Sequence, residues 1–509
     1  MIGPKLAAFA LLAFSATATG QTSPAQPTPA ELRARAAARG WGETLRMDAQ
    51  ALHDDIAANH PGIFNGSDPG FRRLNDEQLR IALGRAATAR TYAAHFYALR
   101  EYVAAFNDGH LDLGAFGASP GDDSHWPGFL TAYGADGEQR VAVRADDGPL
   151  PLGARLVGCD GRSAEQVLAE NVGRFAGRWM LRSQRMDWGR ALFADDGNPY
   201  ARRPQRCTFA VDGQPREIVL NWQSIPHREL VQKFRSLAPQ VRREFGDRTL
   251  LDGTRWVTLG SFNADPQSQG GRALPPLIAA LRSDRDALAR ARAIVLDLRA
   301  NDGGSSDWSR QIAEILWGRP AMNRLHGPPV RVDWRVSEAN LASMREGRDR
   351  QSAGGHLSPE ARHWFDVVIT GLGQALARGE HGLWRHPADS VPVRTAPATA
   401  DPPGLAGPVY ILTDAGCASA CLDAVDLWRA LGAVHVGVTT SADTFYMDVR
   451  NVALPSGIVG ASIPRKVFRG RPRGDNVPVV PVHPFMGDIA DTAALERWIA
   501  GLPESRRRR

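Results

Sequence analysis

The hydrophobic and polar positions of the chain follow different periods in different stretches, and these changes divide the sequence. From residue 30 to residue 106, apolar residues recur at helical spacing and can face one common core. Asn107-Asp-Gly-His110 follows as a turn signal, and His110-Leu-Asp-Leu-Gly alternates like the start of a strand. We therefore expect an N-terminal helical region over residues 30–126.

Residues 127–222 read instead as a small β-rich module. The stretch 139–144 alternates between polar and apolar positions, and residues 207–222 predict a hairpin around Asp212-Gly213. The order of the predicted elements resembles a PDZ module, with residues 175–206 as an insertion. We expect a PDZ-like module over this range.

From residue 223 onward, strand and helix patterns alternate. The stretches 293–299 and 409–412 are almost continuously apolar, which is typical of strands that are covered on both faces in an α/β sheet. We predict an α/β core over residues 223–500, with a long insertion at about residues 320–406 and no internal repeat.

Composition and length predict two or three domains and an exported protein. A chain of 509 residues is too long for one ordinary core, and 43% hydrophobic residues with 13 tryptophans indicate a globular protein. Residues 1–20 resemble a secretory signal: Lys5 precedes the apolar run 6–14, and the small residues 16–18 follow. We expect a disordered leader at 21–29 and an exported protein, periplasmic or secreted. The apolar run is too short for stable membrane insertion.

The net charge of +6 comes almost entirely from arginine, since Lys5, Lys233 and Lys466 are the lysines. Most arginines are scattered through helical patterns, and the dense run lies in the basic tail, residues 501–509. This distribution predicts a solvated surface. No finger, recognition helix or aromatic–basic pattern accompanies it, so we expect no nucleic-acid partner.

The four cysteines fall into two pairs. Cys159 and Cys207 lie in the same region and can form a disulfide in an oxidising compartment, a point that the sequence leaves open. Cys417 and Cys421 are expected to be two buried small residues rather than a disulfide or a metal pair. We expect no cofactor and no metal.

Ser419 lies where a turn becomes a helix. The apolar strand 409–412 is followed by the small residues of 413–416 and then by a helical pattern. Backbone N–H groups at a helix start are unpaired, which suits a nucleophile beside an oxyanion hole. The alternative is a serine that caps the helix.

Three stretches together resemble the C-terminal processing peptidases, the tail-specific proteases that include the tricorn core. They are Asp297-Leu-Arg-Ala-Asn-Asp-Gly-Gly304, the run from Val409 to Ser419, and Asp108-Gly-His110. The resemblance covers roughly residues 90–490 outside the insertion. It implies a ClpP/crotonase-like α/β core beside a PDZ-like module.

The resemblance also implies roles for individual residues. Ser419 becomes the nucleophile, and the oxyanion hole is assigned to the N–H of Ala420 and to the glycine pair Gly303 and Gly304. Glycines suit this position because the backbone must approach the substrate closely.

The choice of the general base depends on a position where this chain differs from many members of the family. Many members carry a lysine downstream of the serine, where this chain has residues 440–445 and no lysine. The tricorn-like branch uses a histidine before the PDZ-like module, and His110 matches that position. A neutral imidazole can take the serine proton and return it to the leaving amine.

An acid should orient this imidazole. Aligning residues 477–481 with the terminal proline-containing motif of the family assigns the role to Asp475, while Asp443 and Asp448 remain alternatives. The chain contains neither a Gly-x-Ser-x-Gly nor a His-Glu-x-x-His motif, which argues against an α/β-hydrolase and a zinc peptidase.

The sequence thus predicts an exported serine peptidase that acts on peptides or unfolded proteins through an acyl-enzyme. One alternative is a catalytically inactive peptide-binding scaffold on the same fold. Another is an esterase. Cleavage preference and oligomeric state stay open.

Overall fold

The computed structural model describes residues 27–116, 124–134, 136–237, 241–325, 330–353, 357, 359–387 and 404–506. The predicted signal peptide, most of the predicted leader, part of the predicted insertion and the end of the basic tail lie outside these residues. The chain divides into two compact units. Unit 1 comprises the described parts of Met1–Met180, Gln184–Ala238 and Asp448–Lys466, and unit 2 those of Leu181–Ser183, Pro239–Met447 and Val467–Arg509. No described helix is long and apolar enough to cross a membrane.

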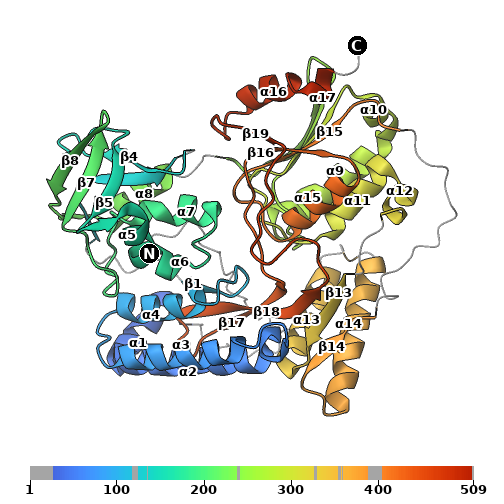
Figure 1. Ribbon diagram of the computed structural model, residues 1–509. Coiled ribbons are helices and arrows are strands. Elements are labelled where there is room, and N and C mark those ends of the chain that lie inside the picture. The colour runs from blue at the N-terminus through green and yellow to red at the C-terminus, as the bar shows by residue number, and fades with distance from the viewer. Residues whose placement is uncertain are drawn as a thin grey trace. The chain divides into compact units, whose positions relative to one another are not determined.

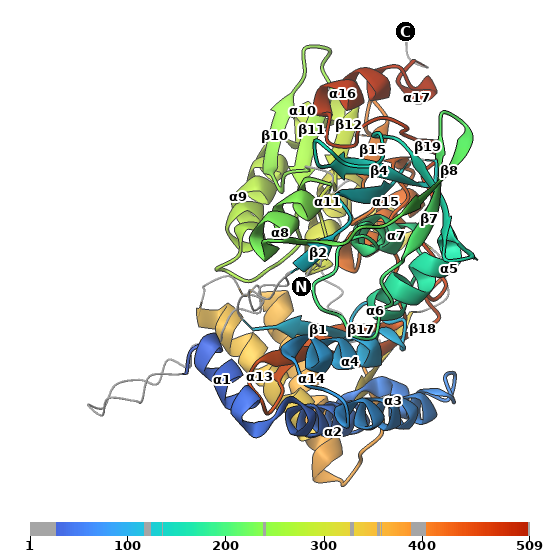
Figure 2. The same cartoon turned by 90° about the vertical axis from the view of Figure 1, so that its left-hand side faces the viewer.

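The first part of unit 1 is helical, as the apolar spacing predicts. Its helices are α1 (Pro29–Arg39), α2 (Trp41–Asn59), α3 (Phe71–Ala86) and α4 (Tyr92–Ala104), with the 3₁₀ turn η1 (Pro61–Phe64). Thr28 and Glu31 form a capping box at the start of α1, and Thr91 caps α4. The helices α2, α3 and α4 pack together through an apolar face that includes the fully buried Leu45 (Figure 2).

The second part of unit 1 is rich in strands. Its elements are β2 (Ser124–Trp126), β3 (Phe129–Tyr133), β4 (Gln139–Arg144), β5 (Arg155–Cys159), β6 (Arg162–Ser163), α5 (Ala164–Leu168), the π-helical η2 (Ala169–Gly173), α6 (Arg174–Ala176), η3 (Gly189–Ala191), β7 (Arg206–Val211), β8 (Gln214–Val219), β9 (Gln223–Ile225) and α8 (His227–Ser236); α7 (Arg182–Trp188) begins in unit 2. The main sheet has the antiparallel order β3-β4-β5-β7-β8, with β6 paired to β5.

The predicted hairpin around Asp212-Gly213 is confirmed. Both residues have left-handed φ values, 48° and 80°, as a two-residue hairpin loop requires. Cys159 and Cys207 lie opposite each other on β5 and β7 and form a disulfide, which answers the question left open by the sequence. That this sheet is a PDZ-like module stays a prediction.

A distant segment completes unit 1. β17 (Tyr446–Ala453) and β18 (Val459–Arg469) form a pair, and the first part of β18 runs antiparallel to β1 (Asp112–Ala115). The carboxylate of Asp48 on α2 accepts the N–H of Ser456 at 2.9 Å, and Arg450 pairs with Asp55. These contacts bind the returning segment to the helices.

Unit 2 is organised by one sheet with the order β10-β11-β12-β15-β16-β19, parallel from β11 onward. Its strands are β10 (Phe245–Thr249), β11 (Arg255–Leu259), β12 (Ile294–Asp297), β15 (Val409–Thr413), β16 (Val434–Gly437) and β19 (His483–Pro484). Every residue of β12 and β15 is buried, which confirms the prediction of strands covered on both faces.

Helices cover the two faces of this sheet (Figure 1). One face packs against α9 (Gln269–Ser283), α11 (Asp307–Trp317) and α15 (Ala420–Ala430), and the other against α16 (Thr492–Ala500). Unit 2 also contains α10 (Arg285–Arg290), α12 (Arg319–Asn323), α17 (Pro503–Arg506) and a group with its own core around Trp334, namely β13 (Arg331–Arg335), α13 (Glu338–Ala353), α14 (Pro359–Ala377) and β14 (Leu383–Arg385). The protein is therefore mixed α/β with several sheets, as predicted. The ClpP/crotonase-like character of the core stays a prediction.

Candidate active site

The turns after β12 and β15 lie side by side because the two strands are parallel neighbours. The carboxylate of Asp414 joins these turns: it accepts the N–H of Ala300 at 2.8 Å and that of Gly416 at 2.9 Å. Burial raises the pKa of Asp414. At the end of β12, Asp297 accepts hydrogen bonds from the indole N–H of Trp256 and from the guanidinium of Arg299. The two turns are thus held together by buried polar contacts.

Ser419 begins α15 in an uncommon backbone conformation. It is the residue before the first helical turn, with φ 56° and ψ −125°, and its side chain makes no capping hydrogen bond to α15. A left-handed φ is uncommon outside glycine and points to local strain. The alternative of a conventional helix-capping serine is therefore wrong. The N–H of Ser419 donates to Asp443 Oδ2 at 2.7 Å, so a buried carboxylate holds this backbone.

The predicted oxyanion residues gather around Ser419. A Cβ on Gly303 would lie 2.6 Å from Ser419 Cβ and 3.0 Å from the nitrogen of Ala420, so only glycine fits there. Gly304 follows at φ 133° and makes a parallel bridge to Phe262. The structure thus brings Gly303, Ser419 and Ala420 into contact within unit 2.

The backbone N–H groups of Gly303, Gly304 and Ala420 differ in whether they donate a hydrogen bond. Gly303 N–H donates to Asn301 Oδ1 at 2.9 Å. Within the part of the chain that the structure describes, the N–H groups of Ala420 and Gly304 donate no hydrogen bond. Backbone N–H groups without an acceptor, such as that of Ala420 directly after the serine, are the donors that an oxyanion hole requires.

The cysteines that flank Ser419 form a disulfide, which corrects the prediction of two unpaired small residues. Cys417 and Cys421 are both fully buried, as predicted, but their Cα atoms lie 5.4 Å apart, within disulfide range, and their sulfurs are bonded. The spacing alone did not indicate this bond because Cys417 precedes the helix, so its direction depends on the turn at Ser419.

His110 lies in unit 1, in the turn between α4 and β1. Its own N–H donates to Asp108 Oδ1 at 2.9 Å, and its Nδ1 lies 3.9 Å from the same oxygen. The second oxygen of Asp108 lies 3.6 Å from Nε2 of His60, a buried residue at the start of η1. The sequence did not indicate His60, because the residue lies far from the motif along the chain and belongs to no pattern.

The candidate acids have different surroundings. Asp475 is exposed, and its Oδ1 accepts the N–H of Phe445 at 3.0 Å. Asp448 pairs with Arg465 and Lys466 in unit 1; although burial disfavours its charge, these cations hold its pKa at about 2. Asp443 is the candidate acid whose carboxylate contacts the backbone of Ser419.

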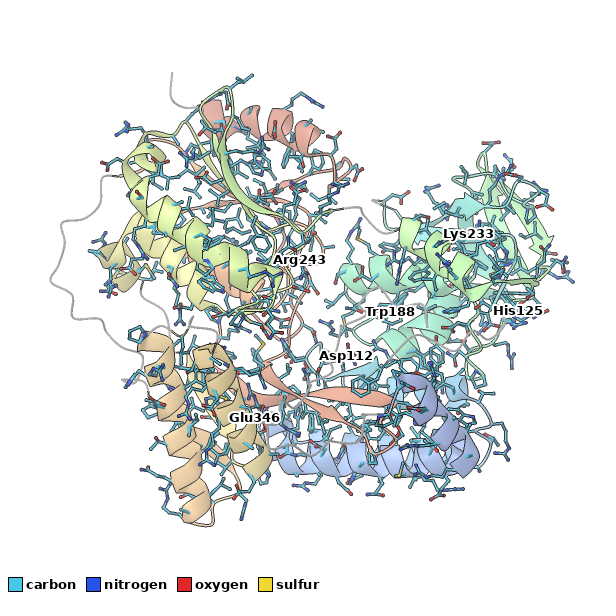
Figure 3. All side chains as sticks on the ribbon, turned by 180° about the vertical axis from the view of Figure 1, so that it is seen from behind. Asp112, His125, Trp188, Lys233, Arg243 and Glu346 are labelled. Carbon is cyan, nitrogen blue, oxygen red and sulfur yellow. A yellow bond between two sulfur atoms is a disulfide. The ribbon has the colours of Figure 1, made fainter. Side chains whose placement is uncertain are left out.

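The two lysines of the described structure lie close to acidic side chains. Lys466 lies 3.4 Å from Asp448, and Lys233 on α8 lies 3.4 Å from Glu229 and 5.0 Å from the ring centre of Trp126 (Figure 3). The described residues contain no group of three or more His, Cys, Asp or Glu side chains arranged to hold a metal ion.

Comparisons with known proteins define the fold. No family model and no curated protein matches the sequence. Mature CPAF matches with a TM-score of 0.57 and 13% identity over 90% of this chain and 96% of that chain. CPAF complexed with lactacystin matches at 0.54 and 14% identity, over 90% and 98%. The photosystem II D1 C-terminal processing protease matches at 0.32 and 12% identity, over 86% and 92%. The resemblance to the C-terminal processing peptidases is thus confirmed at the level of the fold.

Proposed function

We propose that this chain is a serine-type peptidase that hydrolyses peptide bonds through an acyl-enzyme. The observation that carries the proposal is Ser419, which begins α15 with a left-handed φ of 56° and no capping bond. Strained residues of this kind cluster at active sites because the surrounding structure must hold them. Gly303 and the N–H of Ala420 lie beside this serine on a fold shared with CPAF.

In the proposed reaction, Ser419 Oγ attacks the peptide carbonyl while His110 takes its proton. The negative charge that develops on the carbonyl oxygen is stabilised by the N–H groups of Ala420 and Gly304, with Gly303 giving the backbone room to approach. His110 then returns the proton to the leaving amine, and an acyl ester remains on Ser419. Water hydrolyses this ester, again with His110 as the base.

The third member of the proposed catalytic group is an acid. The resemblance assigns Asp475 to the acid's place, and we carry it as the candidate from that source. Its carboxylate accepts the N–H of Phe445, which gives it a defined position in unit 2.

The proposed substrates are peptides or unfolded proteins, and the proposed location is outside the cytoplasm. All four cysteines are paired in two disulfides. Stable disulfides are typical of exported proteins, which supports the proposal of export.

The test replaces Ser419 and His110 by alanine in separate variants. We expect both to lose peptide hydrolysis by about 10³-fold or more, as removal of a member of a catalytic serine–histidine group does. A fluorophosphonate probe should label the wild type on Ser419 and leave the Ser419→Ala variant unlabelled.

Two controls match these changes. Ser268→Ala removes a conventional cap, since Ser268 Oγ accepts the N–H of Gly271 at the start of α9. His53→Gln removes a histidine that pairs with Asp54 and Asp76. Both controls should retain activity. Wild-type hydrolysis in Ser419→Ala would overturn the proposal. Absence of labelling in the wild type would favour the inactive scaffold. A wild type that is labelled and hydrolyses esters but not peptides would favour the esterase.

A further inference from the structure

We propose that Asp108, in place of the Asp475 that the resemblance assigns, is the carboxylate that positions His110, and that His60 in turn holds Asp108. The inference rests on the proposed function, because it concerns the same base. In this proposal, the Asp108-Gly-His110 turn and η1, both in unit 1, together hold the imidazole of His110 in position.

Asp108 is a buried carboxylate between two histidines. Its side chain is 1% exposed, with Oδ1 near His110 and Oδ2 near His60. A buried carboxylate is costly unless charged or polar groups surround it. Although burial works against the charge, the neighbouring His60 and His110 keep the pKa of Asp108 below its usual value, so this group is an anion at neutral pH.

His60 has one defined orientation. Its Nδ1 accepts the N–H of Gly62 at 2.9 Å, and its ring stacks on Phe71 with the centroids 4.4 Å apart. Burial lowers the pKa of His60, so the ring is neutral. A neutral imidazole whose Nδ1 accepts must carry its proton on Nε2, the nitrogen that lies 3.6 Å from Asp108 Oδ2. His60 therefore presents an N–H to the carboxylate.

The same carboxylate faces the other imidazole. His110 Nδ1 lies 3.9 Å from Asp108 Oδ1, and the ring is 14% exposed. This separation exceeds a hydrogen bond, and catalytic hydrogen bonds are often long in the absence of substrate and tighten when it binds. With Nδ1–H directed at Asp108, Nε2 becomes the nitrogen that accepts the serine proton.

The turn is also held from its other side. Arg178 N–H donates to Asn107 Oδ1 at 2.7 Å, and its guanidinium fills the space where a Cβ on Gly109 would lie, at 2.5 Å. Arg178 therefore packs closely against the backbone of Gly109 in this turn. On the side of His60, the charge of Asp68 also acts on this cluster.

The decisive experiment replaces Asp108 by asparagine in the full chain. We expect kcat to fall by about 10²-fold or more with KM little changed, because the amide cannot stabilise the imidazolium that forms during the reaction. Because KM stays near its wild-type value, the loss should appear equally in kcat and in kcat/KM, which is the pattern of an interaction made only in the transition state.

Asp48→Asn is the matched control, since Asp48 is another fully buried carboxylate of unit 1 that pairs with a histidine, His95, at 2.8 Å. This variant should lose stability but keep kcat and KM. If the Asp48→Asn and Asp108→Asn variants have the same kcat when compared at equal stability, the inference is overturned.

Two substitutions at His60 keep the inference testable if Asp108→Asn does not fold. His60→Gln retains a side-chain N–H donor, whereas His60→Phe removes it, so kcat should fall more in His60→Phe. Asp475→Asn is measured alongside them. If Asp475→Asn lowers kcat and the His60 and Asp108 variants do not, Asp475 is the orienting acid and the inference is wrong.

The outcome also separates this inference from the proposed function. Wild-type hydrolysis in Ser419→Ala or His110→Ala overturns the proposed function itself. Loss of activity in both of those variants, combined with wild-type kcat in Asp108→Asn, supports the peptidase but shows that Asp108 does not position His110.

Discussion

At the residue scale, the candidate site depends on a serine held in an unfavourable backbone conformation. A left-handed φ costs a non-glycine residue about 1–3 kcal/mol and persists only where neighbours impose it. For Ser419 these neighbours are the carboxylate of Asp443, the close packing of Gly303 and the disulfide between Cys417 and Cys421. Each of these contacts can be removed separately.

The packing of Gly303 gives the first test. Gly303→Ala places a methyl group 2.6 Å from Ser419 Cβ at a position with φ 106°. We expect the rate of fluorophosphonate labelling to fall by about 10²-fold, because displacement of a nucleophile by about 1 Å has effects of this size. Gly432→Ala is the control: it has a similar φ of 95° but no atom within 4 Å, so it carries backbone strain without the contact. Equal loss of labelling in both variants would contradict the assignment.

The carboxylate of Asp443 gives the second test. Asp443→Ala leaves the N–H of Ser419 without the acceptor that it has at 2.7 Å, and an unsatisfied buried donor costs about 1–3 kcal/mol. We expect Asp443→Ala to lower kcat at least about tenfold, and Asp443→Asn, which keeps a carbonyl acceptor, to lower it less. Steady-state kinetics with measured thermal stability checks the order. A smaller effect in the alanine variant than in the asparagine variant would show that the hydrogen bond is not what matters.

At the element scale, the turn between β15 and α15 carries a short covalent loop. In the chain-entropy description, the Cys417–Cys421 loop, with a sequence separation of 4, stabilises the fold by about 2 kcal/mol, and Cys159–Cys207, with a separation of 48, by about 4 kcal/mol. We therefore expect Cys159→Ala/Cys207→Ala to lose more stability, and Cys417→Ala/Cys421→Ala to lose more labelling of Ser419. Chemical denaturation and labelling rates of the two double variants measure both effects. If the larger losses of stability and labelling occur in the same double variant, the disulfide does not act on the turn.

Sequence and structure agree best for elements that one local pattern determines. The buried strands β12 and β15 and the β7–β8 hairpin follow from apolar runs and from an Asp-Gly turn. The position of Gly303 beside Ser419 was implied by the family resemblance, and the structure supplies the physical reason: parallel neighbouring strands bring their following turns to one edge of the sheet. Contacts between distant segments could not be predicted this way. The pairing of His60 with Asp108, and of Asp443 with the N–H of Ser419, depends on tertiary packing that leaves no periodic signal.

At the scale of the whole molecule, each unit contains a histidine whose pKa changes on folding, and the two changes have opposite signs. His435 on β16 belongs to unit 2, and its Nε2 lies 2.8 Å from the hydroxyl of Thr413. Burial and then the charge of Arg429 lower the pKa of His435 to about 4. Between the unfolded value of about 6.5 and this folded value, the unfolded chain binds a proton that the folded chain does not.

Because the unfolded chain binds this extra proton, acid should destabilise the folded protein. As the pH falls from 6.5 to 4, His435 should reduce the free energy of unfolding by about 3 kcal/mol, since each pKa unit corresponds to about 1.4 kcal/mol. His435→Gln cannot titrate, so its stability should depend less on pH over this interval. Urea denaturation at a series of pH values, followed by tryptophan fluorescence, gives the difference between wild type and variant and cancels the carboxylates that both contain.

A histidine of unit 1 provides a comparison of opposite sign. Burial opposes the charge of His53, but its hydrogen bonds with Asp76 and Asp54 outweigh burial and raise its pKa. Its contribution is therefore present below its unfolded pKa and is lost as the pH rises through the folded value. His53→Gln should lose its stabilisation at low pH, while His435→Gln regains stability there relative to the wild type. If both variants shift in the same direction between pH 4 and 6.5, burial of His435 does not control the acid response of unit 2.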